Sequence, residues 1–236
     1  MTYLDYFFIG VILLYVLLGL KRGLIKTLYS FFSLILGILI TYYLYPFISE
    51  IIFKYTKVYF GVSEKVVQAL QLEELAKNKV SPQDQLEMMN QLKIPEALKV
   101  FLKENRNSEM FEILKATKIE EYIGGTIAAI AINALVFVLV FVFVMFVLKI
   151  ITHVFDIISM LPILHQLNKL GGGFLGLVQG ILVSWIICIF FSMAFTFEKW
   201  HELFEYLELS PVASVLYNNN FLMKLVLNLQ QLFVIN

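Results

Sequence analysis

Four long runs without a charged residue constrain this chain more than any other feature of its sequence. They are Tyr6–Leu20, Thr27–Ser49, Tyr122–Leu148 and Leu170–Phe197, of 15, 23, 27 and 28 residues. About 20 helical residues cross a hydrocarbon core of roughly 30 Å. Each run is therefore predicted to be a transmembrane helix. The first reaches full length only with Tyr3 and Leu4, which places Asp5 at its rim.

The composition agrees with a chain built for lipid. Apolar residues make up 60% of the sequence and charged residues 15%, whereas soluble domains average about 45–50% and about 25%. The charges are also segregated, because residues 50–121 hold 23 of the 36. Spanning β-strands would alternate polar and apolar residues, and residues 134–148 include no polar residue. We therefore expect an all-α integral membrane protein with four transmembrane helices.

The short links between these helices predict which side of the membrane each end faces. Their charged residues are Lys21, Arg22 and Lys26 in the first link, and Lys149, Asp156 and Lys169 in the third. Short links with an excess of Lys and Arg stay in the cytoplasm. Both termini and residues 50–121 are therefore expected on the extracytoplasmic side.

The spans divide the chain into four parts. Residues 1–49 form the first pair of helices with a basic cytoplasmic turn, and residues 50–121 form an extracytoplasmic helical insert. Residues 122–197 form the second pair with a Gly-rich cytoplasmic link, and residues 198–236 an extracytoplasmic amphipathic tail. No Gly/Ser-rich linker or repeat sets the insert apart, so a lid or stalk is expected rather than an independent domain.

Proline residues mark the expected helix starts outside the membrane, because proline fits the first turn of a helix. In the insert, Ser81 precedes Pro82, and Pro95 precedes a helix predicted over Glu96–Glu104. In the tail, Pro211 marks another start, after Ser210.

Apolar residues of the tail recur at the spacing of one helix face. They are Leu222, Leu225, Val226, Leu229, Leu232 and Phe233. Such an amphipathic helix can lie on the outer membrane surface or pack on the insert. The sequence leaves both arrangements open.

Small residues recur at every fourth position in three of the expected spans. The rows are Gly172, Gly176 and Gly180 with Ser184; Gly125, Ala129 and Asn133; and Ser33, Gly37 and Thr41. This spacing lets a second helix approach to backbone distance, and the alternative is that the row lines a pore. The predicted helix-packing positions are Gly172, Gly176, Gly180, Gly125, Ala129 and Gly37.

The polar residues of the spans offer little chemistry. Asn133 and Gln179 are predicted to hydrogen-bond to neighbouring helices, and no ionisable residue lies in the middle of a span, which argues against proton-coupled transport. His153 with Asp156 is interpreted as a solvated pair at the membrane surface, and Cys188 as a small buried apolar residue. No zinc, nucleophile or phosphate-loop motif occurs. The sequence therefore predicts no enzyme, no catalytic residue, no cofactor and no metal.

Two stretches of the chain resemble the colicin V production protein family. The first, from Leu4 to Gly37, has Asp5 beside the first apolar run and a turn of Lys21, Arg22 and Gly23. The second, from Leu161 to Trp185, has a Leu-Pro pair, an Asn and a Gly-rich entrance to the last helix. The motif positions that carry over are Asp5, Lys21, Arg22, Gly23, Pro162, Asn168 and the row Gly172, Gly176 and Gly180. The long insert and the tail after Phe197 depart from the family pattern.

The resemblance implies a protein of the bacterial inner, or cytoplasmic, membrane, linked by the family name to production or export of a peptide toxin and without an assigned reaction. We expect a non-enzymatic accessory or scaffold in that process and in envelope maintenance. The alternative is a small oligomeric channel or transporter. The expected partners are the lipid bilayer and another membrane or envelope protein, with a homo-oligomer as a further option. Nucleic acid is not expected, because 18 basic residues balance 18 acidic ones.

Overall fold

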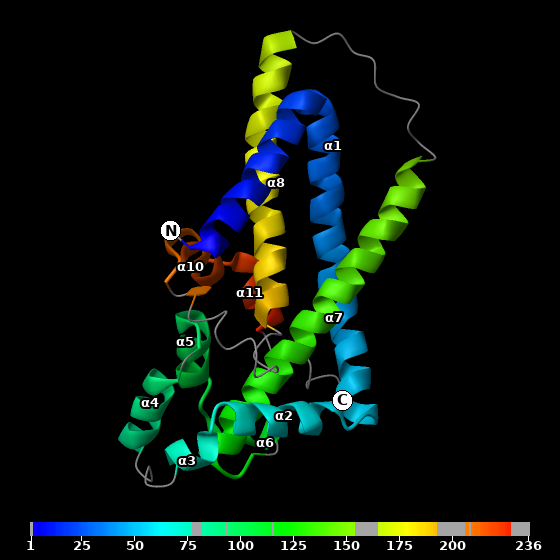
Figure 1. The fold of residues 1–236 in the computed structure, drawn as a ribbon. Coiled ribbons are helices and arrows are strands. Elements are labelled where there is room, and N and C mark those ends of the chain that lie inside the picture. Colours follow the sequence, from blue (N-terminus) through cyan, green and yellow to red (C-terminus); the bar gives the residue numbers. More distant parts are fainter. Residues whose placement is uncertain are drawn as a thin grey trace.

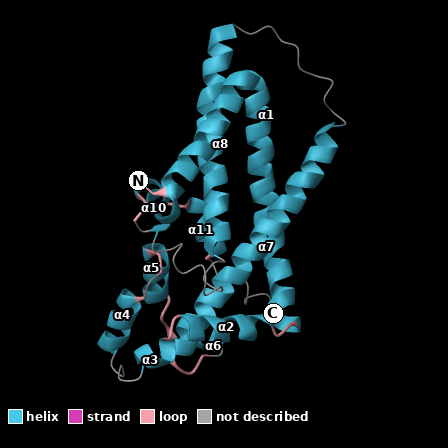
Figure 2. Ribbon diagram, viewed as in Figure 1, coloured by secondary structure: helices cyan, strands magenta, loops and turns pink. Residues whose placement is uncertain are grey.

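The computed structural model describes residues 2–76, 82–92, 94–114, 116–153, 165–192, 206–207 and 209–227. Every regular element within these ranges is a helix, which confirms the all-α class (Figure 2). The helices are α1 (Tyr3–Tyr55), α2 (Val58–Ala69), α3 (Leu72–Ala76), α4 (Pro82–Gln91), α5 (Glu96–Glu104), α6 (Ser108–Ile113), α7 (Ile119–His153), α8 (His165–Phe191), α10 (Pro211–Asn218) and α11 (Phe221–Val226).

The longest helix, α1, is a hairpin. Its backbone leaves the helical region at Gly23, where φ is 76° and ψ is 173°, a conformation that glycine adopts far more easily than other residues. Figure 1 shows the chain running from the N-terminus to this turn and then back again. We call residues 3–22 the first arm and residues 24–55 the second arm. The first predicted link thus shrinks to one non-helical residue.

The two other long helices pack on this hairpin. Helix α8 lies along the first arm, with the rings of Phe8 and Phe191 6.1 Å apart, and α7 crosses the second arm, with the rings of Tyr45 and Phe137 5.6 Å apart. Both helices begin before the uncharged runs that predicted them. Residues 193–197, the end of the fourth predicted span, lie outside the described residues.

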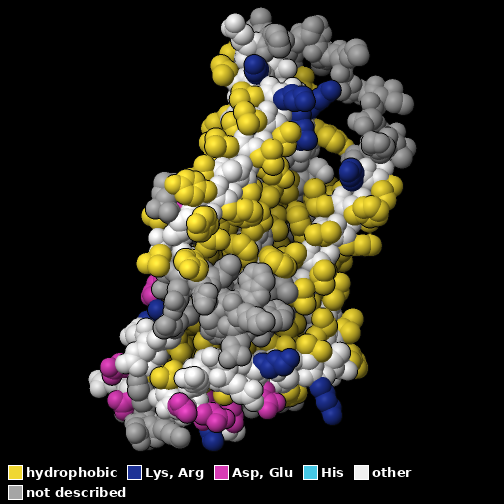
Figure 3. Space-filling model, in the orientation of Figure 1, with side chains coloured by type: hydrophobic (Ala, Val, Ile, Leu, Met, Phe, Trp, Pro, Cys, Tyr) yellow, Lys and Arg dark blue, Asp and Glu magenta, His cyan; other side chains and the backbone are white. Residues whose placement is uncertain are grey.

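Among the described residues, three helices are long and apolar enough to cross a membrane: Tyr3–Tyr55, Ile119–Ile150 and Gln166–Phe191. Figure 3 shows apolar side chains over the middle of the bundle, Lys and Arg gathered where α1 turns, and acidic side chains at the opposite end. We call these ends the basic end and the insert end. The basic end includes the turn of α1, the end of α7 and the start of α8 (Figure 1), and its exposed basic residues are Lys21, Arg22, Lys26, Lys149 and Lys169.

Helices α2 to α6 form the insert and enclose apolar residues of their own. The prediction that helices begin at Pro82 and span Glu96–Glu104 is confirmed. Fully or almost fully buried side chains of the insert are Leu72, Met88, Met89, Ile94, Leu98, Leu102 and Met110. Tyr122 of α7 fastens this core to the bundle, because its ring stacks on Phe111 at 4.7 Å and its hydroxyl donates to the Leu102 carbonyl at 2.9 Å.

Within the tail, α10 begins at Pro211, as predicted, and α11 follows it. Leu222 and Val226, from the predicted apolar face, are buried, and α11 contacts α7 and α8. For these two residues, the structure favours packing on the protein over a position on the membrane surface. Leu229, Leu232 and Phe233 lie outside the described residues.

Two side chains fasten the tail to the end of α8. The Asn220 amide accepts from the Met223 N–H at 3.0 Å, which caps α11, and donates to the Trp185 carbonyl at 2.8 Å. The hydroxyl oxygens of Tyr217 and Ser192 are 2.9 Å apart. Burial raises the pKa of Tyr217, so this hydroxyl stays protonated as a hydrogen-bonding group.

Candidate functional site: two motif junctions and a pocket at the insert end

The row Gly172, Gly176 and Gly180 faces the first arm of α1 at backbone distance. A Cβ atom at Gly172 would lie 2.3 Å from the Gly19 carbonyl oxygen, and one at Gly176 would lie 2.3 Å from the Tyr15 carbonyl oxygen. At Gly180 the nearest atom would be a backbone carbon at 2.9 Å. Any side chain at these positions would displace backbone, not a flexible side chain. This is the geometry that small-xxx-small spacing allows between membrane helices.

The turn of α1 meets the start of α8 through two family-motif residues. The Asn168 side-chain oxygen accepts from the backbone N–H of Leu24 at 2.7 Å. That N–H begins the second arm and has no partner within its own helix. A Cβ atom at Gly23 would lie 2.5 Å from the Asn168 side-chain nitrogen. Gly23 and Asn168 therefore form one junction, although 144 residues separate Asn168 from Leu24.

The other motif positions at the basic end are placed less specifically. Lys21 and Arg22 are exposed beside the turn, where long basic side chains reach lipid headgroups and water. Pro162 lies outside the described residues.

The remaining small residues contact different elements. A Cβ atom at Gly37 would lie 2.6 Å from the Met145 sulfur of α7, and one at Gly125 would lie 2.5 Å from the Tyr59 hydroxyl of α2. Ala129 is fully buried. The row from Gly125 thus begins against the insert and not against another long helix.

Asp5 forms a second junction, between the start of α1 and the tail. Its side chain is fully buried. One carboxylate oxygen accepts from the Thr2 N–H at 2.8 Å, and the other accepts from the N–H groups of Val212 and Ala213 at 2.8 and 3.3 Å. A carboxylate at the N-terminus of a helix is favoured by both hydrogen bonding and the helix dipole. Asp5 therefore caps α1 and α10 at once.

The two amides of the spans differ in their surroundings. Gln179 donates to the Ser30 hydroxyl at 3.0 Å, so the prediction that it bonds to a neighbouring helix is confirmed. The same prediction is wrong for Asn133, which is fully buried and has no hydrogen-bond partner for either side-chain atom among the described residues. Its neighbours Ile132 and Ala134 are buried as well. The spacing of residues on one helix does not determine whether the facing helix has a polar group at that level.

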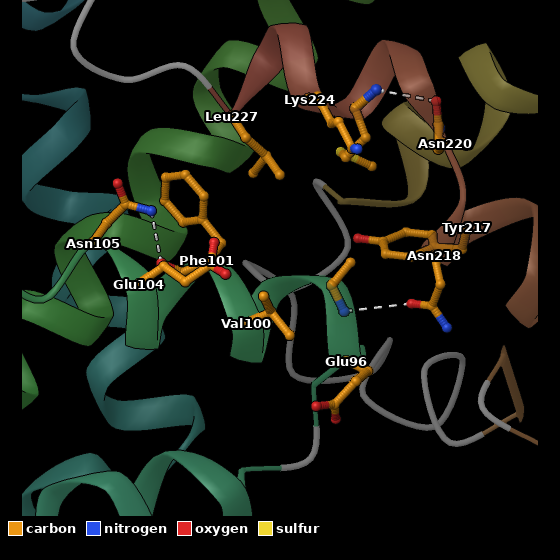
Figure 4. A pocket seen from close by; sticks show the side chains of 12 residues that line it. Glu96, Val100, Phe101, Glu104, Asn105, Tyr217, Asn218, Asn220, Lys224 and Leu227 are labelled. Carbon is orange, nitrogen blue, oxygen red and sulfur yellow. Dashed lines mark hydrogen bonds between the residues drawn. The ribbon is translucent and has the colours of Figure 1, made fainter.

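A pocket of about 690 Å³ opens at the insert end between α5 on one side and α10 and α11 on the other (Figure 4). Its volume lies in the range of small-molecule and peptide-anchor sites. The lining residues are Glu96, Ala97, Val100, Phe101, Glu104, Asn105, Tyr217, Asn218, Asn220, Met223, Lys224 and Leu227. One hydrogen bond that crosses between its walls runs from the Ala97 N–H to the Asn218 side-chain oxygen at 3.4 Å.

The chemistry of this pocket suits binding. The amides of Asn105 and Asn220 are already bonded to backbone groups of the protein. Three charged side chains remain at the walls: Glu96, Lys224 and Glu104, of which Glu96 lies 4.0 Å from Lys99. A lining that combines apolar side chains with amides and three charged groups suits an amphipathic ligand. Among the described residues, no group of three or more His, Cys, Asp or Glu side chains is arranged to hold a metal ion.

Sequence reasoning did not identify this pocket. Its walls come from residues 96–105 and 217–227, which are more than 100 positions apart in the chain. The predicted starts at Glu96 and Pro211 gave the two helices but not their adjacency. The one usable signal was that Phe101 and Leu227 are apolar residues outside the membrane runs.

The comparisons with known proteins give one result. The family model of the Colicin V production protein matches residues 4–72 and 112–220. No curated protein and no solved structure matches the chain. The matched residues include Asp5, the Gly23 and Asn168 junction and the glycine row, whereas residues 73–111, which contain α5, lie outside the match. Because the match covers most of the chain, the protein belongs to the colicin V production protein family, whose membership points to a membrane protein in toxin production.

Proposed function

We propose that this protein crosses the bacterial inner membrane four times and serves as a non-enzymatic accessory or scaffold in toxin production or export. In this proposal it recognises its partner in the pocket at the insert end. The observation that supports the proposal is where the two walls of that pocket lie in the chain. One wall, α5, lies in the part of the chain that the family model does not match, and the other wall joins α10, which lies within the match, to α11, which lies beyond it. The protein would then recognise its partner partly through residues outside the family match, while its long apolar helices belong to the part that the family shares.

The four crossings are supported by the lengths of the arms of α1. The first arm has 20 residues and the second 32, and each exceeds or equals the roughly 30 Å of a hydrocarbon core at about 1.5 Å per residue. The five exposed basic residues at the basic end support a cytoplasmic position for that end. The insert, the tail and both termini are then extracytoplasmic.

Single cysteines test this topology in a chain with Cys188→Ser. The changes Glu87→Cys and Asn219→Cys are at exposed positions of the insert and the tail, and Lys169→Cys is at an exposed position of the basic end. We expect an impermeant maleimide to label the first two in intact cells and the third only after permeabilisation. The opposite pattern would reverse the orientation.

Pocket-filling substitutions test the recognition role. Val100 lines the pocket and is 40% exposed, so Val100→Trp fills the cavity without disturbing the core. We expect Val100→Trp to abolish complementation of a deletion strain, scored by growth under envelope stress, at normal protein abundance on an immunoblot.

Two variants serve as comparisons for this experiment. Leu86→Trp, on α4, makes the same kind of change at a 36% exposed position outside the pocket lining, and it should retain activity. Gln179→Leu removes an intramembrane amide and should also retain activity. Activity of Val100→Trp, together with loss of activity for Gln179→Leu at normal abundance, would favour the channel or transporter instead.

A further inference from the structure

The length of the first arm of α1 is close to the thickness of the hydrocarbon core of a bilayer. The arm has 20 residues, which matches the hydrocarbon core at about 1.5 Å per residue. Lys21 and Arg22 stand at its basic end, where such residues sit at the headgroups. With the four crossings proposed above, Tyr3 and Asp5, at the other end of the arm, lie toward the opposite boundary between hydrocarbon and water.

The carboxylate of Asp5 holds the tail at the same depth in the membrane as the start of α1. It accepts hydrogen bonds from the N–H groups of Val212 and Ala213, in the first turn of α10. Figure 1 shows α10 beside the start of α1. The hydrogen bonds to Asp5 therefore fix the depth of α10 in the membrane, and the mean hydropathy of the tail does not decide it.

The exposed face around this junction has the composition of a membrane interface. Residues 209–223 include no charged residue. Exposed apolar and aromatic side chains on α10, on the residues that flank it in sequence and on the first turn of α1 are Tyr3, Tyr6, Tyr206, Leu209, Val215 and Phe221, and the exposed polar side chains there include Asn218 and Asn219. Tyrosine is enriched where a protein crosses the headgroup layer. The insert differs, because α4 exposes the polar residues Gln83, Glu87 and Asn90.

We propose that α10 forms an interfacial surface together with the flanking residues Leu209 and Phe221 and the first turn of α1. This surface rests in the lipid headgroups on the insert side of the bilayer. The occupant is lipid, because the surface continues the exposed apolar face of the first arm, where Phe7, Leu13 and Leu17 are exposed. This surface differs from the apolar face that the sequence suggested, since Leu222 and Val226 point into the protein. It also places one wall of the pocket beside the membrane surface. The proposal rests on the four crossings proposed above.

Spin labels measure the depth directly. We would place single cysteines at Val215, Leu13 or Glu87 in the Cys188→Ser protein and reconstitute each in vesicles of phosphatidylethanolamine and phosphatidylglycerol. Power saturation then compares collisions with oxygen, which concentrates in lipid, and with the nickel complex of ethylenediaminediacetate, which stays in water. Leu13 marks the middle of the first arm and Glu87 the exposed insert. A label at Leu209, 72% exposed, repeats the measurement outside α10.

The expected order of the ratio of oxygen to nickel accessibility is Leu13, then Val215 and Leu209, then Glu87, with Val215 several-fold above Glu87. A ratio at Val215 and Leu209 equal to that at Glu87 would overturn the interfacial surface, since both would lie in water. Shielding of both positions from both reagents would also overturn it, because a protein would then cover the face. A water-like ratio at Leu13 would instead contradict the four crossings.

Discussion

Gly176→Leu should destabilise the packing of α8 on the first arm of α1 more than any other single change in the bundle that we consider. A Cβ atom at Gly176 would lie 2.3 Å from the Tyr15 carbonyl oxygen and 3.1 Å from the Val16 Cα. Both are backbone atoms, so no rotamer change can make room. Overpacking of this kind costs about 1–3 kcal/mol, and we expect the upper part of this range. Thermal unfolding in mild detergent measures the loss.

Gly10→Leu is the matched control for this prediction. It makes the same chemical change within the first arm, and a Cβ atom at Gly10 would meet nothing within 4 Å. We expect the melting temperature of this variant to stay close to that of the unchanged protein. Equal losses for the two variants would show that glycine-to-leucine changes are harmful anywhere in the bundle, and the packing role of the row would then fail.

Asp5→Leu should release α10 from the start of α1. The change removes the acceptor of three backbone N–H groups, those of Thr2, Val212 and Ala213, of which the last is buried and the others are part-buried. Hydrogen bonds to charged groups are stronger than neutral ones, and unsatisfied buried donors are costly. We expect hydrogen exchange of residues 211–218 to become about tenfold faster, which is the local opening expected when such a cap is lost. Mass spectrometry of the purified protein measures it.

Two further variants separate the cap from general damage. Asp5→Asn keeps one carbonyl oxygen for Val212 and Ala213 and should give an intermediate rate. Tyr6→Leu changes the adjacent residue, whose side chain is 63% exposed, and should leave the rate unchanged. An unchanged rate in Asp5→Leu would mean that other contacts hold α10 in place.

The sequence determined the helical class and several helix boundaries, because these depend on local properties. Uncharged runs close to or longer than the thickness of the bilayer core predicted the apolar helices. Helices that begin at Pro82, Glu96 and Pro211 were predicted from proline, which fits the first turn. The glycine row was also visible as a pattern, since residues four apart share a helix face.

Only the tertiary structure decided which faces meet. Asn168 reaches Leu24 and Asp5 reaches Val212, across 144 and 207 positions of the chain. Asn133 has no hydrogen-bond partner in the part of the chain that the structure describes, although spacing predicted one. The pattern of one helix specifies its apolar face but not the helix opposite or the register between them, which depend on how whole surfaces interlock. For the same reason the pocket between α5 and the tail has no signature in either segment alone.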